Sequence, residues 1–125
     1  KYNNNSKTEL LEKYFGNRLI SESKKPIAVL AYDVEARKPR IIASYKDHNI
    51  RVISAINATS AAPLYYPTVQ IEDGSWLIDG GVVANNPCLV GYNEARKYFK
   101  TDKGIIGPLV YSVKKYNKDF IEQFL

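Results

Sequence analysis

Two stretches, Ala58-Thr-Ser-Ala-Ala-Pro-Leu-Tyr-Tyr-Pro67 and Trp76-Leu-Ile-Asp-Gly-Gly-Val-Val-Ala-Asn-Asn-Pro87, decide the fold of this 125-residue chain. Between and within them, two short alternating segments, Val69–Glu72 and Ser75–Asp79, flank the pair Asp73-Gly74. Alternation on both sides of an Asp-Gly pair is a strong local signal for a β-hairpin. The sequence therefore predicts that Asp79 ends the second strand of a hairpin.

The segments around these stretches alternate between helical and strand patterns. One helix is predicted over Thr8–Phe15 and ends at Gly16, and a second is predicted over Val52–Ala62 and ends at Pro63. A third helix is predicted after Asn86, with Pro87 in its first position and an apolar stripe formed by Cys88, Tyr92, Ala95 and Phe99. A strand is predicted over Pro26–Asp33, which is apolar enough to be covered on both faces. After a break at Lys38-Pro39, Arg40–Tyr45 is predicted to be its hairpin partner. A further strand is predicted over Leu109–Val113. A last helix is predicted over Asp119–Leu125. Strands mixed with helices indicate an α/β fold.

Asp79 has the surroundings of a functional carboxylate. Gly80 and Gly81 follow it, and glycine allows a positive φ and leaves room for another backbone or a ligand beside the carboxylate. A carboxylate at the C-terminal end of a strand, with a capped helix soon afterwards, lies where α/β folds tend to place their chemistry. Asp-Gly is also common in plain turns, so these three residues alone leave both interpretations open.

The composition and the start of the chain bear on the class of protein. The chain is 45% hydrophobic and 12% aromatic, enough to bury a core. It begins at Lys1 and contains no methionine, which is compatible with a piece of a longer protein. No apolar run approaches the roughly 18 residues that a membrane span needs, and no leader peptide pattern opens the sequence. We therefore expect a soluble or peripheral membrane protein, with the cytoplasm as the favoured compartment.

Metal and disulfide chemistry find little support in the sequence. Cys88 and His48 are each the only residue of their type. A lone cysteine forms no internal disulfide, and zinc needs several ligands brought together. We expect a buried thiol at Cys88, a surface imidazole at His48, no metal site and no cofactor.

The net charge of +5 is unevenly distributed along the chain. Between Arg96 and Lys118, seven basic residues stand against one acid, Asp102. Such a run suits anionic lipid or nucleic acid, although a solvated face is the more common explanation. Nothing resembles a recognised nucleic-acid-binding module, so no nucleic-acid partner is expected.

The ordered set of motifs resembles the second half of patatin-like phospholipases. It runs from Ala-Thr-Ser-Ala-Ala-Pro through an aromatic pair, a proline and a hairpin to Asp-Gly-Gly and Asn-Asn-Pro. Upstream, Ala31-Tyr-Asp33 and Lys38-Pro39 resemble the strand and hairpin of that family, so the likeness extends from about Leu10 to Phe99. It implies a three-layer α/β/α domain, of which residues 1–125 are the C-terminal portion.

The resemblance also implies a chemistry. Members of the family are lipid acyl hydrolases that cleave ester bonds of phospholipids or related acyl lipids with a Ser-Asp dyad and no cofactor. A serine in Gly-x-Ser-x-Gly attacks the ester carbonyl, a glycine-rich loop binds the oxyanion, and the aspartate of Asp-Gly-Gly takes the serine's proton. By its place in the motif that aspartate is Asp79, supported by Gly80 and Gly81.

The chain departs from a complete enzyme of this family. The seven glycines are Gly16, Gly74, Gly80, Gly81, Gly91, Gly104 and Gly107, and no pair of them frames a Gly-x-Ser-x-Gly. Ser60 is interpreted as helix-end packing rather than as a nucleophile. We therefore expect the nucleophile and the oxyanion loop upstream of Lys1, and no activity from this chain alone. The alternative is a non-catalytic domain that kept the fold and binds lipid or protein.

Overall fold

The computed structural model of the chain describes residues 3–84, 88–99 and 109–111. Its elements in chain order are α1 (Asn5–Phe15), η1 (Ile20–Glu22), β1 (Ile27–Asp33), β2 (Lys38–Ala43), α2 (Val52–Thr59), β3 (Val69–Gln70), β4 (Trp76–Asp79), η2 (Gly80–Val82), α3 (Cys88–Phe99) and β5 (Leu109–Tyr111). The prediction of an α/β fold is confirmed.

The sheet is built around β1. Antiparallel pairing gives the order β2-β1-β4-β3, and β5 pairs with β1 in parallel. Because β2 occupies one edge of β1, β4 and β5 share the other edge: β4 lies beside Ala31–Asp33, and β5 lies beside Ile27–Val29. Asp79 is therefore in register with Ala31, near the middle of the sheet rather than at its margin.

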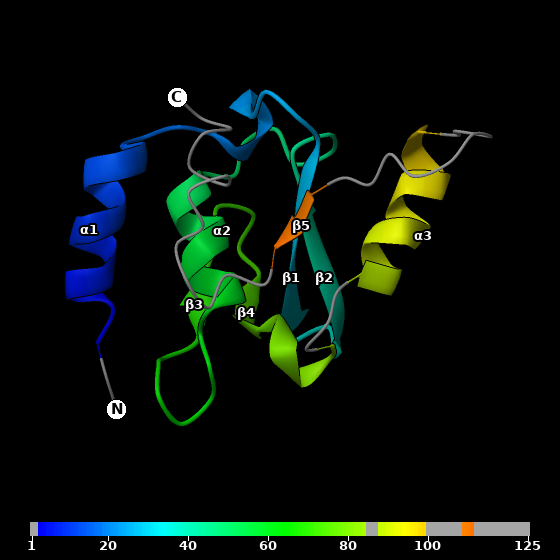
Figure 1. Cartoon of the computed structure of the whole chain (residues 1–125). Coiled ribbons are helices and arrows are strands. Elements are labelled where there is room, and N and C mark those ends of the chain that lie inside the picture. The colour runs from blue at the N-terminus through cyan, green and yellow to red at the C-terminus, as the bar shows by residue number, and fades with distance from the viewer. Residues whose placement is uncertain (1–2, 85–87, 100–108, 112–125) are drawn as a thin grey trace.

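Helices lie on both sides of this sheet (Figure 1). α1 and α2 are on one side and α3 is on the other, which gives helix, sheet and helix layers. α2 packs against β1, β3 and β4, and α1 packs on α2. The three-layer arrangement expected from the resemblance is present in the described residues.

The core lies between α1, α2 and the sheet. Its fully buried side chains are aliphatic, with one aromatic residue from α1; the largest are Phe15, Leu11, Ile20, Ile27, Ile42, Ile56, Leu77, Val29 and Val52. Every residue of α2 is buried, including Ser54, Asn57 and Thr59. A helix buried all round needs polar side chains with partners, and each of these three makes a hydrogen bond outside α2. α2 is therefore the central helix of the core, and its polar side chains link it to the surrounding elements by hydrogen bonds.

The local predictions are confirmed for most elements. α1 ends where predicted, at Gly16, whose φ of 54° suits glycine, and it begins at Asn5, three residues earlier than predicted. The hairpin of β3 and β4 turns through Gly74, with a φ of 89°. β5 confirms the predicted strand up to Tyr111. The helix predicted over Asp119–Leu125 lies outside the described residues.

The break predicted at Lys38-Pro39 is wrong. Both residues belong to β2, where Pro39 pairs with Tyr32, and the chain turns earlier, over residues 34–37. The Asp33 carboxylate holds this turn by accepting hydrogen bonds from two backbone N–H groups of the turn. Proline is tolerated in β2 because β2 is an edge strand among the described residues, so the missing N–H breaks no ladder on the outer side.

The stripe predicted for α3 is wrong in one position. Tyr92 is exposed, whereas Gly91, Glu94 and Ala95 are buried. The Tyr45 hydroxyl donates to the Glu94 carboxylate (2.8 Å), so the helix turns a charged residue inward. Burial, together with this carboxylate, raises the pKa of Tyr45. Asn86, Pro87 and the side chain of Cys88 lie outside the described residues.

In the described part of the chain, no helix has the length and apolar character needed to cross a bilayer.

Candidate active site

Asp79 is the last residue of β4, the second strand of the β3–β4 hairpin. Its backbone N–H donates to the carbonyl of Ala61 (3.0 Å), in the segment that follows α2. Its side chain caps η2, because Oδ1 accepts a hydrogen bond from the Gly81 N–H (2.6 Å). Only 6% of the residue is exposed. The carboxylate is thus buried and oriented, and Oδ2 accepts no hydrogen bond from the residues that the structure describes.

Gly80 is required by a close approach between two backbones. A Cβ built on Gly80 would lie 2.3 Å from the carbonyl oxygen of Leu30 and 2.6 Å from its carbonyl carbon. Real Cβ atoms do not approach a backbone so closely, so only glycine fits. The expected room for another backbone is therefore confirmed at Gly80.

The positive φ that the sequence allows at Gly80 and Gly81 is not adopted. Neither Gly80 nor Gly81 has a positive φ, since both lie in the right-handed 3-10 helix η2. The positive-φ glycines of the described residues are Gly16 and Gly74. The pair serves tight packing at Gly80 and, at Gly81, an N–H directed at Asp79.

Thr59 completes the packing at this point, and the sequence offered no signal for its role. Its hydroxyl donates to the Leu30 carbonyl (2.6 Å), the same oxygen that Gly80 approaches. Since η2 begins at Gly80, the β1–β4 ladder ends at Asp79, and Thr59 provides the partner for Leu30 from α2. This bond fixes the end of α2 against β1, beside Asp79.

Ser60 is the C-terminal cap residue of α2. Its hydroxyl donates to the carbonyl of Ile56 (2.6 Å) and accepts a hydrogen bond from the Lys7 ammonium (2.9 Å). A serine that attacks a carbonyl needs its hydroxyl proton directed at a base. Here the proton points to the helix backbone, which favours the prediction that Ser60 is structural.

Lys7 is the charged residue that sequence reasoning missed. It lies in the first turns of α1, 53 residues from Ser60 along the chain, so no local pattern pointed to it. Its Nζ lies 4.2 Å from the centre of the Tyr66 ring. Burial lowers the pKa of Lys7, and the Asp79 carboxylate opposes that effect by raising it. A cation thus belongs to the surroundings of Asp79.

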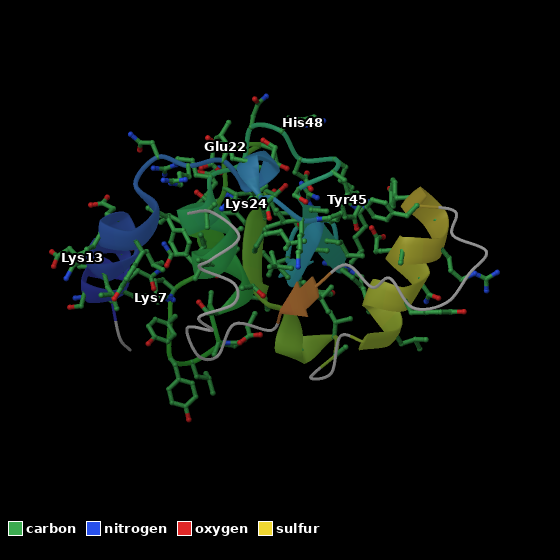
Figure 2. The ribbon with its side chains drawn as sticks, turned by 45° about the horizontal axis from the view of Figure 1, so that its top comes forward. Lys7, Lys13, Glu22, Lys24, Tyr45 and His48 are labelled. Atoms are coloured by element: carbon green, nitrogen blue, oxygen red, sulfur yellow. The ribbon has the colours of Figure 1, made fainter. Side chains whose placement is uncertain are left out.

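Neither a metal centre nor a basic surface emerges from the described residues. Within them, no group of three or more His, Cys, Asp and Glu side chains is placed to hold a metal ion. His48 is exposed, as predicted, at the outer edge of the molecule (Figure 2). Of the seven basic residues between Arg96 and Lys118, Arg96 and Lys97 are described, and both are exposed; the other five lie outside the described residues.

Comparison with known proteins finds similar sequences among patatin-like proteins and phospholipases. The chain is 28% identical over 122 residues to patatin-like protein 3 of Arabidopsis thaliana, covering 87% of this chain and 28% of that protein. It is 31% identical over 107 residues to patatin-like protein 2 of the same plant, covering 75% and 26%. A cGAMP-activated phospholipase of Vibrio cholerae is 42% identical over 59 residues, which cover 46% of this chain and 17% of that protein.

The chain therefore spans less than a third of the length of these three relatives. The patatin-like phospholipase family model matches residues 1–92, which include α1, the whole β1–β4 ladder, Asp79 and η2. With a match over most of its length and an aspartate buried at the end of β4, this chain belongs to the patatin-like phospholipase family.

Proposed function

We propose that this chain supplies the general base of a lipid acyl hydrolase and that Asp79 is that base. The observation that carries the proposal is the state of Asp79: the carboxylate is buried at a strand end, one oxygen is fixed by the Gly81 N–H, and the other accepts no hydrogen bond from the described residues. A carboxylate so held has one oxygen oriented and one available for an incoming hydroxyl. Membership of a phospholipase family gives the reaction class.

In the proposed reaction, a serine hydroxyl attacks the ester carbonyl carbon while its proton passes to Asp79. The C–O bond to the leaving alcohol then breaks, and the proton returns from Asp79 to the alcohol oxygen. A water molecule cleaves the acyl-serine in the same way, with Asp79 again taking and returning the proton. A carboxylate is a weak base in water, with a usual pKa of about 4, so this role depends on partial removal of solvent and on close placement. Both the burial and the bond to Gly81 serve that need.

The serine is proposed to come from residues outside this chain. No Gly-x-Ser-x-Gly occurs in the 125 residues, and the Ser60 hydroxyl is engaged with the Ile56 carbonyl. The chain then acts as the C-terminal part of a catalytic domain whose nucleophile and oxyanion loop lie in another part of the protein. Its substrates are proposed to be phospholipids or related acyl lipids.

Peripheral contact with an anionic membrane is part of this proposal. The substrate class lies in a bilayer, and the basic run from Arg96 to Lys118 is the charge that this chain offers to a surface. Its two described basic residues, Arg96 and Lys97, are exposed. Each basic residue near an anionic surface contributes on the order of 1 kcal/mol to binding.

The test is Asp79→Asn in the full-length protein, with release of fatty acid from a phospholipid as the measurement. Asparagine keeps the shape and the acceptor for Gly81 but takes up no proton, so turnover falls by about 10²–10⁴-fold. Asp73→Asn is the matched control, because it makes the same chemical change at an exposed hairpin turn and leaves turnover near that of the wild type. Near-normal turnover of Asp79→Asn would place the proton acceptor elsewhere.

A second measurement separates the enzyme from a binding domain. If no serine in the full-length protein reacts with a fluorophosphonate probe, and no lipid ester is cleaved, the domain binds lipid or protein without chemistry. The chain of 125 residues alone is expected to give no turnover of a p-nitrophenyl ester above background. Reproducible activity of the purified chain would contradict the interpretation of Ser60 as structural.

A further inference from the structure

The loop between α2 and β3 exposes large apolar side chains. Its residues 63–67, Pro-Leu-Tyr-Tyr-Pro, are called the apolar loop below. Leu64 is 83% exposed, the highest value for a large apolar residue in the described part of the chain, and its neighbour Tyr65 is 59% exposed. In Figure 1 the segment between α2 and β3 extends away from the helices and the sheet. Adjacent apolar side chains held in water mark a surface for interaction.

The shape of the apolar loop is fixed by its own contacts. The backbone N–H groups of Tyr65 and Tyr66 both donate to the Ala62 carbonyl (3.2 and 3.0 Å). Tyr66 is half-buried, and the Lys7 ammonium of α1 lies 4.2 Å from the centre of its ring, a contact that the ring quadrupole stabilises. The loop is therefore anchored to the fold through Tyr66, while Leu64 and Tyr65 face outward.

The backbone of Leu64 indicates that its side chain is needed at this place. Its φ is 73°, in the left-handed region that residues with a Cβ avoid. Glycine or asparagine fits that conformation better than leucine does. Backbone strain of this kind is concentrated at sites that bind or react. A strained leucine with most of its surface in water thus contributes neither backbone fit nor core packing, and an external contact explains it.

The apolar loop lies beside the candidate base. The Asp79 N–H donates to the carbonyl of Ala61 (3.0 Å), and Ala61 is two residues before the loop. Figures 1 and 2 both show η2, which begins directly after Asp79, at the same end of the molecule as the segment between α2 and β3. Val82 of η2 is 53% exposed. Exposed apolar side chains therefore occupy the end of the molecule at which β4 places Asp79.

The chemistry of the apolar loop suits a lipid surface. No charged residue occurs between Arg51 and Glu72, and a charged side chain is costly to insert into a bilayer. Tyrosine favours the interface between water and lipid, where its ring is apolar and its hydroxyl reaches the headgroups. Backbone N–H groups without partners are also costly there. Both loop prolines have no N–H, and those of the two tyrosines are paired.

We propose that the apolar loop is a lipid-contact element, in which Leu64 and Tyr65 enter the headgroup region of a phospholipid surface and bring that surface to the site of Asp79. The inference rests on the proposed function, which requires an acyl lipid at Asp79. The contact is made by apolar side chains, so it does not depend on the charge of the lipid. It differs in this respect from the contact proposed for the basic run.

Vesicle binding by the full-length protein tests the contact without enzyme activity. Leu64→Ala with Tyr65→Ala removes the two side chains and keeps their Cβ atoms. Leu10→Ala with Tyr14→Ala is the matched control, a leucine and a tyrosine exposed on α1. The loop variant is expected to bind phosphatidylcholine vesicles roughly tenfold more weakly than the wild type. The loss is the same at about 50 and 300 mM salt, because apolar contacts are not screened. The control binds like the wild type.

Kinetics separate contact with a surface from a change in the active site. With phosphatidylcholine vesicles below saturation, the loop variant is expected to release fatty acid roughly tenfold more slowly than the wild type. With p-nitrophenyl butyrate in solution, which needs no lipid surface, the loop variant and the wild type turn over at similar rates.

A thiol label reports whether the loop meets lipid or another part of the enzyme. Leu64→Cys in the full-length protein is expected to react readily with a maleimide in the absence of lipid, above the background of the parent protein's own cysteines. Phosphatidylcholine vesicles are expected to slow that reaction several-fold, because the lipid covers the thiol. Leu10→Cys on α1 is expected to react equally with and without vesicles.

Each contrary result overturns the inference. Equal binding of phosphatidylcholine vesicles by the loop variant and the wild type would do so, as would an equal loss of turnover on both substrates with binding unchanged. A thiol at position 64 that is unreactive without lipid would show that the enzyme itself covers the loop. A thiol that vesicles leave unprotected would exclude insertion even if the double variant fails to fold. A protein without turnover whose loop still binds vesicles would refute the proposed function and leave the lipid contact standing.

Discussion

The α-carbon of Gly80 faces the backbone of Leu30 so closely that a Cβ on Gly80 would lie 2.3 Å from the Leu30 carbonyl oxygen. This approach joins the turn after Asp79 to the middle strand of the sheet, and it explains the glycine by packing rather than by a positive φ. The position of the candidate base, Asp79, therefore depends on Gly80 because no side chain fits against Leu30, and not because Gly80 adopts a backbone conformation that other residues avoid.

Gly80→Ala is expected to destabilise the protein by about 1–3 kcal/mol, because backbone atoms must move apart to admit the methyl group. Gly74→Ala is the comparison: it meets open space and adds only the strain of a φ near 89°. Thermal unfolding measures the cost, and amide chemical shifts locate it. Shift changes at Leu30 and Asp79 are expected for Gly80→Ala alone. A Gly80→Ala protein with unchanged shifts there would contradict the close approach.

Thr59→Val is expected to lower the free energy of unfolding by about 1–3 kcal/mol, since it leaves the buried Leu30 carbonyl without the hydroxyl that bonds it. Thr59→Ser keeps the hydroxyl and loses one methyl group, a cost of about 1 kcal/mol. Thr68→Val makes the same substitution at an exposed site and changes stability by less than about 0.5 kcal/mol. Equal stabilities of Thr59→Val and Thr68→Val in urea would show that the Thr59 bond is unimportant.

The lowered pKa of Glu72 predicts that the stability of the protein depends on pH. Burial raises the pKa of Glu72, but hydrogen bonds from Ser54 and Arg51 outweigh it, and the pKa falls below its usual value of 4.5. The folded protein thus binds this proton less readily than the unfolded chain. The stabilisation is present above pH 4.5 and is lost as the pH falls through the lowered value.

The corresponding experiment compares Glu72→Gln with the wild type by urea unfolding between pH 7 and pH 3. Glu72→Gln is expected to be less stable than the wild type at pH 7, and the difference shrinks toward pH 3. Glu9→Gln, at an exposed glutamate of α1, serves as the control. A difference between Glu72→Gln and the wild type that stays constant with pH would mean that the charge of Glu72 contributes nothing.

Vesicle binding tests the proposed contact with anionic membranes. Phosphatidylserine vesicles are expected to bind the chain more tightly than neutral vesicles, and binding falls between about 50 and 300 mM salt as the Debye length shortens. Arg96→Gln with Lys97→Gln weakens binding, whereas Lys24→Gln with Lys25→Gln, an equal loss of exposed charge outside the basic run, does not. Equal affinity for neutral and anionic vesicles would make the basic run an ordinary surface.

Much of this protein is determined locally by its sequence. Gly16 ends α1, Gly74 makes the turn of the β3–β4 hairpin, and the apolar run after Pro26 forms β1, because each signal acts within a few residues of the structure it specifies. The same local logic puts Asp79 at the end of β4, where the prediction placed it. The ordered motifs also sufficed to identify the family.

Only the tertiary structure decided which side chains meet. Thr59 reaches Leu30 across 29 residues, and Lys7 reaches Ser60 across 53. The face that α3 buries includes Glu94, which accepts a hydrogen bond from Tyr45, 49 residues away, and the apolar periodicity of the helix did not predict this contact. Such contacts leave no trace in a local window, since a hydrogen bond between distant residues is specified by how α2, β1 and α1 pack together. The position of the carboxylate can therefore be predicted from its neighbours in sequence, whereas the cation near it is placed by the fold.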